Sequence, residues 1–127
     1  MVKKGLLYAR SHEWVEIDGT KAKVGISDYA QSSMGEIVFV ELPDVDDVID
    51  KEESFGVIES VKAASDVFMP VTGKILSVNE ILEDSPELLN QDAYDNYIME
   101  IELEGEIDKT GLLTAEEYEA YIADAEH

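Results

Sequence analysis

The sequence contains no cysteine, which excludes disulfide bonds, thiolate catalysis and every zinc site that depends on cysteine. Its two histidines, His12 and His127, stand alone in the sequence. The nucleophile motif GxSxG, the phosphate-binding P-loop and the dinucleotide-binding glycine pattern do not occur. We therefore expect no catalysis by the chain on its own.

Basic residues are also scarce. Nine Lys and Arg stand against 30 Asp and Glu, which gives a formal net charge of −21 at pH 7. A surface of this charge repels phosphate groups, so we expect neither nucleic acid nor an anionic membrane as a partner. The charge steers association toward basic partner surfaces, although an acidic coat can serve solubility alone.

Long hydrophobic runs are missing as well, and no stretch approaches the length of a membrane span. Lys3 and Lys4 are followed only by a short apolar patch at residues 6–8, without the small-residue cleavage site of a secretory signal. A chain of 127 residues that is 45% hydrophobic has the size of one domain. We therefore expect a single cytoplasmic domain over residues 1–127, monomeric because no long apolar stripe is apparent.

The acidic stretch at residues 44–53 lacks the pattern of a calcium-binding loop. Ile49 stands where an EF-hand needs glycine, and Phe55 stands where it needs a bidentate glutamate. We interpret the stretch as a solvated loop and expect no metal site in the chain.

Alternating apolar and polar residues, many of them β-branched, predict a mainly β fold of two sheets packed face to face. The Asp18-Gly19 pair suits a tight hairpin turn, and Pro43 is expected to end a strand. The predicted strands cover residues 14–17, 20–26, 36–42, 54–61, 65–70, 74–78 and 97–103.

Three short helices are expected around these strands. Ser27 is placed to cap a helix over residues 28–33, and Ser85 followed by Pro86 predicts a capped helix over residues 87–90.

The strongest helix signal lies at the C-terminus, over residues 114–126. Thr114 and Glu117 form a capping box. The apolar face of this helix is predicted to consist of Tyr118, Tyr121, Ile122 and Ala125.

One lysine stands at the expected apex of a hairpin. In the stretch ESVKAASD, residues 59–66, Lys62 is surrounded by the small residues Val61, Ala63 and Ala64. Side chains at an apex point into water and are reachable by large partners. A primary amine there suits an amide-linked cofactor arm, although most exposed lysines serve only solubility.

Two long stretches resemble the glycine cleavage system H proteins, a family of lipoyl carriers. These are GVIESVKAASDVFMPVTGKILSVNEILEDSPELLN at residues 56–90 and SHEWVEIDGTKAKVGISDYAQSSMGEIVFVELPDV at residues 11–45, and the match covers about residues 8–103. Biotin carriers instead place Met on both sides of the modified lysine, where this chain has Val61 and Ala63. The lipoyl domains of 2-oxoacid dehydrogenases place Asp before that lysine, where this chain has Val61.

The resemblance implies a barrel-sandwich hybrid fold that carries lipoic acid in amide linkage on Lys62. It implies a non-catalytic carrier that shuttles the aminomethyl group of glycine between enzymes. These partners are a glycine decarboxylase (P protein), an aminomethyltransferase (T protein) and a dihydrolipoyl dehydrogenase (L protein). A lipoate ligase or a lipoyl/octanoyl transferase would attach the arm.

The resemblance also implies roles for polar residues near the hairpin. Ser11, Glu13 and Asp66 match family residues that hold the cationic amine of the loaded arm in a cleft. The alternative is that these three are ordinary surface residues.

Glu59, with Val61 and Ala63, is expected to belong to the surface that the ligase or another partner recognises. His12 is assigned no chemistry, and it is expected to pack with Trp14, which should face the core.

The stretch NQDAYDNYIMEIEL departs from the family pattern. Ala93 replaces a proline, Asp95 and Asn96 replace glycines, and Tyr97 replaces a tryptophan, while Asp46 replaces a glycine further upstream. Tyr97 can serve as a half-buried aromatic, and Asn tolerates a left-handed backbone. The departures keep one alternative open, an H-like lipoyl carrier acting in lipoyl relay or another lipoate-dependent pathway. A third alternative is an acidic interaction module that is never lipoylated, and the intact stretch ESVKAASD argues against it.

Overall fold

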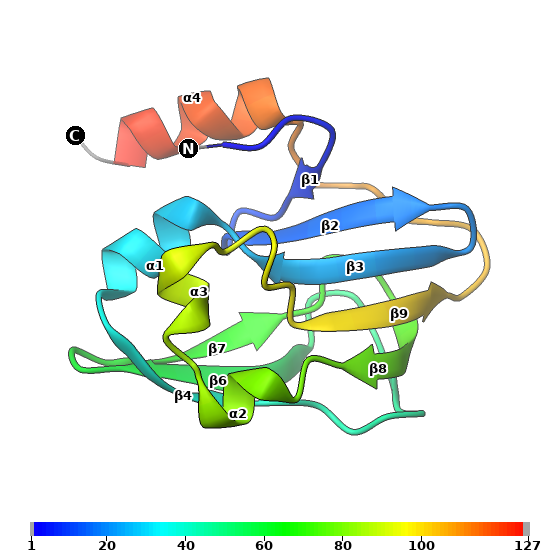
Figure 1. The fold of residues 1–127 in the computed structure, drawn as a ribbon. Helices are drawn as coiled ribbons and strands as arrows, with labels where there is room; N and C mark the ends of the chain where they lie inside the picture. Colours follow the sequence, from blue (N-terminus) through cyan, green and yellow to red (C-terminus); the bar gives the residue numbers. More distant parts are fainter. Residues whose placement is uncertain (1, 126–127) are drawn as a thin grey trace.

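The computed structural model describes residues 2–125, and its strands form two antiparallel sheets (Figure 1). The larger sheet has the order β1-β2-β3-β9-β8-β5, and the smaller has the order β4-β6-β7. The strands are β1 (Leu7–Tyr8), β2 (Glu13–Asp18), β3 (Lys21–Ile26), β4 (Ile37–Glu41), β5 (Val48–Ile49), β6 (Ser54–Ser60), β7 (Ala64–Phe68), β8 (Gly73–Val78) and β9 (Met99–Leu103).

The predicted strands are confirmed, with ends that shift by one or two residues. In the β2–β3 hairpin, Asp18 still pairs with Lys21, so the two loop residues are Gly19 and Thr20 rather than the Asp-Gly pair. Gly19 has a φ of 64°, which suits the first position of such a loop. The two-residue strands β1 and β5 were not predicted, because two residues are too few to show an alternation.

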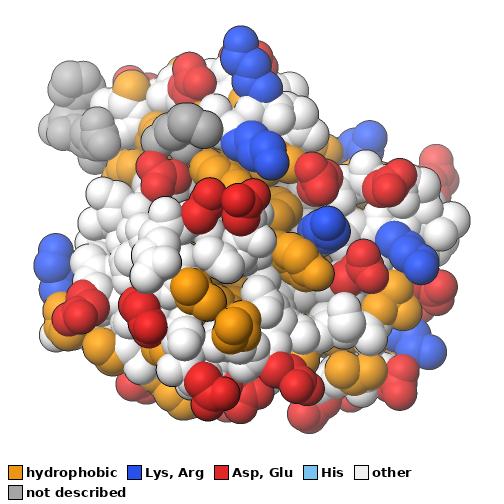
Figure 2. All heavy atoms as spheres, in the orientation of Figure 1, with side chains coloured by type: hydrophobic (Ala, Val, Ile, Leu, Met, Phe, Trp, Pro, Cys, Tyr) orange, Lys and Arg blue, Asp and Glu red, His pale blue; other side chains and the backbone are white. Residues whose placement is uncertain are grey.

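The main core fills the space between the two sheets. Its largest fully buried side chains include Ile37, Ile58, Met69, Ile75 and Ile101. Within residues 2–125, no helix is long and apolar enough to span a membrane. Acidic side chains lie scattered among apolar ones on the face drawn in Figure 2, as the net charge leads one to expect.

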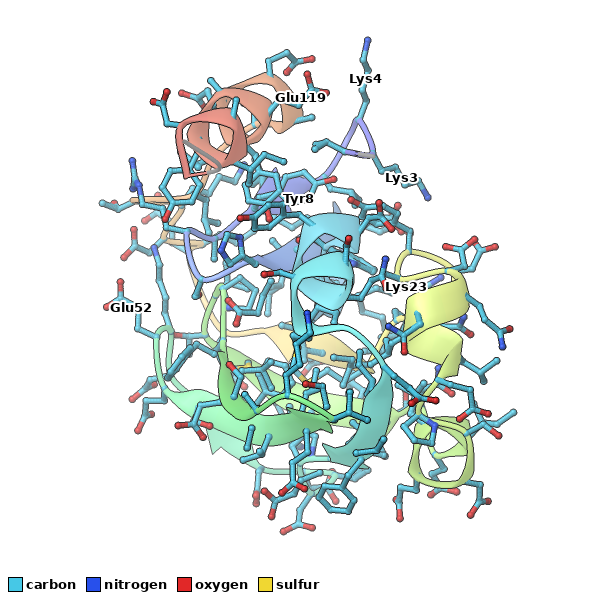
Figure 3. All side chains as sticks on the ribbon, turned by 90° about the vertical axis from the view of Figure 1, so that its left-hand side faces the viewer. Lys3, Lys4, Tyr8, Lys23, Glu52 and Glu119 are labelled. Carbon is cyan, nitrogen blue, oxygen red and sulfur yellow. The ribbon has the colours of Figure 1, made fainter. Side chains whose placement is uncertain are left out.

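A second, smaller core lies on the other side of the large sheet. Trp14 and Val15 are neighbours in β2, yet they are only 2% and 1% exposed, because both faces of this strand are covered. Trp14 packs with Tyr8 and Tyr118 in the second core, which α4 (Ala115–Ala125) covers. Figure 3 shows Tyr8 beneath this helix.

The prediction that His12 packs with Trp14 is wrong. His12 precedes β2 with a left-handed φ of 82°, which turns its ring away from the alternation of the strand. The ring Nδ1 lies 2.8 Å from the hydroxyl of Tyr118, and that hydroxyl also lies 2.7 Å from Ser27 Oγ. Burial lowers the pKa of His12, so the imidazole is held neutral in this network.

The helices at the two ends of the set form as predicted. Ser27 caps α1 (Asp28–Met34) by accepting the N–H of Ala30 at 3.1 Å. Thr114 and Glu117 cap α4 with reciprocal hydrogen bonds of 2.9 and 3.3 Å. The side chain of Ala125, Glu126 and His127 lie outside the described residues.

The prediction that Ser85 caps a helix is wrong. An unpredicted helix, α2 (Ile81–Asp84), precedes it, and the N–H of Ser85 donates to Ile81 O at 2.8 Å as this helix ends. The next helix, α3 (Leu88–Gln91), begins after Glu87 without a side-chain cap. Ser85 and Pro86 therefore belong to the turn between two short helices.

The segment that departs from the family pattern forms an ordered turn. The carboxylate of Asp92 accepts the N–H groups of Tyr94 and Asp95, each at 3.0 Å, and Asn96 Nδ2 donates to two carbonyl groups at 2.9 Å. Asn96 could tolerate a left-handed backbone but does not adopt one, and its side chain contributes to the turn through these two hydrogen bonds. Asp46 does adopt it, with a φ of 76°.

Candidate functional site

The tip of the β6–β7 hairpin projects beside α1 at the edge of the fold (Figure 1). Only Val61 and Lys62 lie between Ser60 and Ala63, which are joined by a 2.8 Å backbone hydrogen bond. The hydroxyl of Ser60 accepts the N–H groups of Lys62 and Ala63 at 3.2 and 3.3 Å. The tip is thus held by its backbone and one hydroxyl, which leaves its outer side open.

The exposed side chain of Lys62 lies along the backbone between α1 and β4. A Cβ atom on Gly35 would lie 3.3 Å from Lys62 Cε and 3.7 Å from Nζ. The N–H of Val61 donates to Glu36 O at 3.0 Å, which fixes the hairpin tip to the residue before β4. The amine is therefore exposed but has a defined place on the surface.

Ser11 and Glu13 are brought together at the start of β2. Ser11 Oγ donates to Glu13 Oε1, and the N–H of Phe68 donates to Glu13 Oε2 at 3.0 Å. The carboxylate is only 1% exposed, and burial raises the pKa of Glu13 to about 7 although both hydrogen bonds act in the opposite direction.

A cavity of about 380 Å³ opens in front of this pair. This size falls within the range of small-ligand sites. Ser11 contributes directly to its wall, while Glu13 is reached through Ser11 and Phe68. The lining residues are Ala9, Arg10, Ser11, Lys51, Glu52, Phe68, Met69, Pro70, Thr110, Gly111 and Leu112.

Asp66 does not share this cavity. It is exposed on β7 and lines a separate hollow of about 410 Å³ together with Glu41, Pro43 and Val57. Two residues of strand, about 7 Å, separate it from Phe68. The structure therefore joins two of the three residues predicted for the cleft and places the third in the adjoining hollow.

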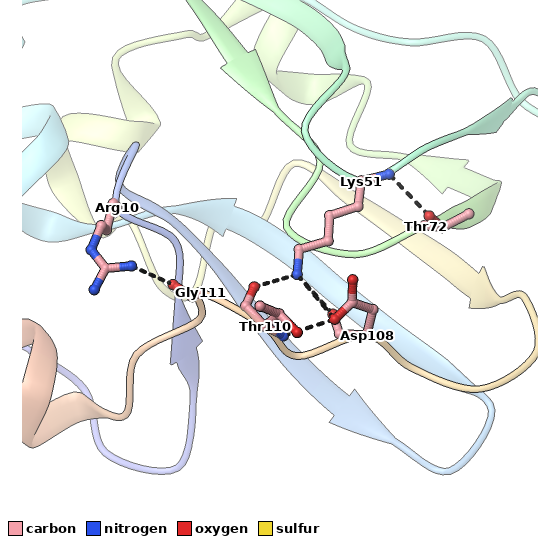
Figure 4. Close-up of polar contacts among 6 residues, drawn as sticks. All are labelled: Arg10, Lys51, Thr72, Asp108, Thr110 and Gly111. Carbon is pink, nitrogen blue, oxygen red and sulfur yellow. Dashed lines mark hydrogen bonds and ion pairs between the residues drawn. The ribbon is translucent and has the colours of Figure 1, made fainter.

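Two basic residues that were not predicted from the sequence bind the segment around Thr110 and Gly111, which forms the far wall of the cavity (Figure 4). Lys51 Nζ donates to Thr110 O and to Asp108 O, the latter at 3.0 Å, and lies 3.6 Å from the Asp108 carboxylate. Arg10 Nη1 donates to Gly111 O at 3.3 Å. These partners lie 57 to 101 residues apart in the chain, so no local pattern could have revealed them.

Glu59, Val61 and Ala63, predicted as a recognition surface, are all exposed around the hairpin tip. Among residues 2–125, no group of three or more His, Asp or Glu side chains is arranged to hold a metal ion.

Comparison with known proteins places the chain in a family. The family model described as glycine cleavage H-protein matches residues 6–125. The chain belongs to the glycine cleavage H-protein family. The match takes in α4, which lies beyond the region where the sequence resembled the family.

Individual members of the family are similar over most of their length. The chain is 55% identical to the glycine cleavage system H protein of Alkaliphilus oremlandii over 114 residues, which cover 90% of each chain. It is 53% identical to the probable glycine cleavage system H protein of Natronomonas pharaonis, over 91% of this chain and 92% of that one.

The crystal structure of a glycine cleavage system H protein from Mycobacterium marinum matches the fold. The TM-score is 0.85 at 29% identity, over 99% of this chain and all of that one. The predicted barrel-sandwich fold and the predicted family are confirmed. With them, the chain is assigned the family's role as a lipoyl carrier in the glycine cleavage system.

Proposed function

We propose that Lys62 is the residue that carries lipoic acid, joined to its Nζ by an amide bond. The support is the geometry of the hairpin: a primary amine at a two-residue tip, exposed, with Ala63 and Ala64 beside it. Forming the amide requires an activated lipoyl donor, and a lipoate ligase or a lipoyl/octanoyl transferase would supply it. When bound, the lipoyl group supplies a disulfide that accepts the aminomethyl group of glycine and carries it between enzymes.

We further propose that the cavity in front of Ser11 and Glu13 receives the loaded end of the arm. An ammonium group held there would donate a charge-assisted hydrogen bond to the carboxylate of Glu13. The buried setting would keep water away from the cargo. Asp66 would add a second carboxylate from the adjoining hollow as the arm passes along β7.

The proposed partners are the glycine decarboxylase, the aminomethyltransferase and the dihydrolipoyl dehydrogenase. The net charge of −21 supports docking on basic surfaces near their active sites. The chain itself would act as a cytoplasmic monomer without catalysis of its own, because the hard chemistry belongs to cofactors and partner enzymes.

Exchange of labelled bicarbonate into glycine tests this function. We expect lipoylated protein to support the exchange with glycine decarboxylase and the variant Lys62→Arg to support none. A lipoylated protein that is a poor substrate for the decarboxylase would contradict the proposal and favour a role in lipoyl relay.

A further inference from the structure

The strand β4 carries a β-bulge beside the hairpin. Ile37 pairs with Ser60 and Phe39 pairs with the adjacent Glu59, so Val38 is an extra residue on β4. A β-bulge changes the direction in which the side chains of a strand point, so it is a specific feature of the fold rather than a defect. Here Ile37 and Val40 stay buried, while Val38 and Phe39 between them are 50% and 46% exposed.

The exposed apolar residues belong to β4 and to the hairpin tip, the two segments that flank the Lys62 side chain. Phe39 pairs across the sheet with Glu59, and Glu59 pairs with Ala64 near the tip of the hairpin. Val61, at the tip, is 64% exposed. The Lys62 side chain itself lies against Gly35, two residues before β4 begins. We call Val38, Phe39 and Val61, together with the carboxylates Glu41 and Glu59, the outer patch.

Within residues 2–125, no ion pair joins the carboxylates Glu41 and Glu59 of the outer patch to a basic side chain. The ion pairs in this part of the chain join Lys51 to Asp108 and Lys74 to Asp46, and both lie outside the patch. The patch therefore offers an apolar centre flanked by free negative charge. An apolar contact with basic residues around it would complement this surface.

We propose that the outer patch is the docking surface for the enzyme that acylates Lys62. This inference rests on the proposed function, in which Lys62 receives the lipoyl group. Before acylation no arm extends from the protein, so the acylating enzyme must bring its donor directly to Lys62 Nζ. It must therefore cover the surface next to Gly35 and β4. Enzymes that act later meet the far end of the arm and need not touch this surface.

Steady-state kinetics of lipoyl transfer by lipoate ligase, with lipoate and ATP, test this surface. Phe39→Ser and Val38→Ser should each lower kcat/KM by about tenfold, as expected for an apolar anchor, with little change in kcat at saturation. The matched control is Val48→Ser on β5 of the other sheet, where the valine is 58% exposed. The control should stay within about twofold of the wild type.

A second assay separates docking from a general defect. Each variant, fully lipoylated at high ligase concentration, should be reduced by dihydrolipoyl dehydrogenase with NADH as the electron donor at the wild-type rate. Thermal unfolding should confirm an intact fold. Unchanged kcat/KM for lipoylation would overturn the proposal. So would a loss confined to the dehydrogenase, or a wild-type dimer in sedimentation that Phe39→Ser dissociates. If the wild type itself gained no lipoyl group, the proposed function would fail rather than this surface.

Discussion

The amide N–H of Phe68 donates a 3.0 Å hydrogen bond to the buried carboxylate of Glu13, 55 residues earlier in the chain. This bond ties the end of β7 to the start of β2, and so joins the strand that follows the hairpin to the proposed cargo cavity. The same carboxylate accepts a hydrogen bond from Ser11, on the cavity wall. Glu13 thereby links the fold to the proposed function, and its substitution should affect both stability and the release of the cargo.

The raised pKa of Glu13 predicts a specific dependence of stability on pH. Burial raises the pKa to about 7 from an ordinary value of 4.5, so between these values the folded state binds more protons than the unfolded state. The contribution of Glu13 to the free energy of unfolding is therefore fully present below pH 4.5 and is lost as pH rises through 7. Glu13→Gln should remove this dependence.

Urea unfolding of the wild type and of Glu13→Gln at pH 5 and pH 8 measures the effect. From pH 5 to pH 8, the unfolding free energy of the wild type should fall by about 3 kcal/mol relative to that of Glu13→Gln. A constant difference would mean that Glu13 has an ordinary pKa. The neighbouring, less buried Glu16→Gln serves as the matched control for the loss of a carboxylate from β2.

Loss of the Glu13 carboxylate should also shorten the life of the loaded carrier. Glu13→Gln should be lipoylated normally but should release its aminomethyl cargo about tenfold faster, because a neutral amide holds an ammonium group less strongly. Release can be followed as free ammonia or formaldehyde from carrier loaded by glycine decarboxylase. An unchanged rate would show that the cargo does not bind at this carboxylate.

Lys51 is predicted to stabilise the far wall of the cavity. Its side chain is only 14% exposed, and its ammonium group bonds to Asp108 and to Thr110 O. Lys51→Met should lower the free energy of unfolding by about 1–3 kcal/mol, because carbonyl groups near the wall lose their donor. Lys74→Met is the control, since that lysine is more exposed and lies 4.0 Å from Asp46. The control should change stability by less than about 0.5 kcal/mol in urea unfolding, and equal effects would contradict this role of Lys51.

The hydroxyl of Tyr118 is predicted to fasten α4 to the sheet. It lies within hydrogen-bond distance of Ser27 Oγ and His12 Nδ1, while its ring stacks on Tyr8 at 4.4 Å. Tyr118→Phe keeps the stacking and removes the hydroxyl, so it should cost about 1–2 kcal/mol of unfolding free energy. Tyr121→Phe, which loses a single bond to Arg10 O, should cost less. Thermal unfolding of both variants makes the comparison, and a reversed order would contradict the network.

The strands and the hairpin were predictable because their signals are local. Alternation marked β2 and β3, and the small residues around Lys62 marked an accessible tip. Ser11 and Glu13 are two residues apart in the sequence, so their proximity is also a local feature. The resemblance to the family implied a shared role for them. The bulge in β4 was not predictable, because the extra residue Val38 breaks the alternation on which strand prediction depends.

Other features depend on contacts between distant segments. Lys51 meets Asp108 and Thr110 through the folding of segments 57 and 59 residues apart, and no spacing rule joins residues at such separations. Both faces of β2 are covered, so the neighbouring residues Trp14 and Val15 are both buried. A strand with one buried and one exposed face would bury only one of the two. The ring of His12, whose backbone has a left-handed φ, likewise packs against tyrosines from distant segments, including Tyr118 and Tyr29.

In the proposed function, Lys62 carries the lipoyl arm. The most direct test is the intact mass of the wild type and of Lys62→Arg, each produced with lipoate and a lipoate ligase. Arg cannot form the amide, and the exposed tip should tolerate the change without loss of fold. We predict a gain of one lipoyl group in the wild type and none in the variant. A wild type without added mass, or a variant that gains the same mass, would contradict the account.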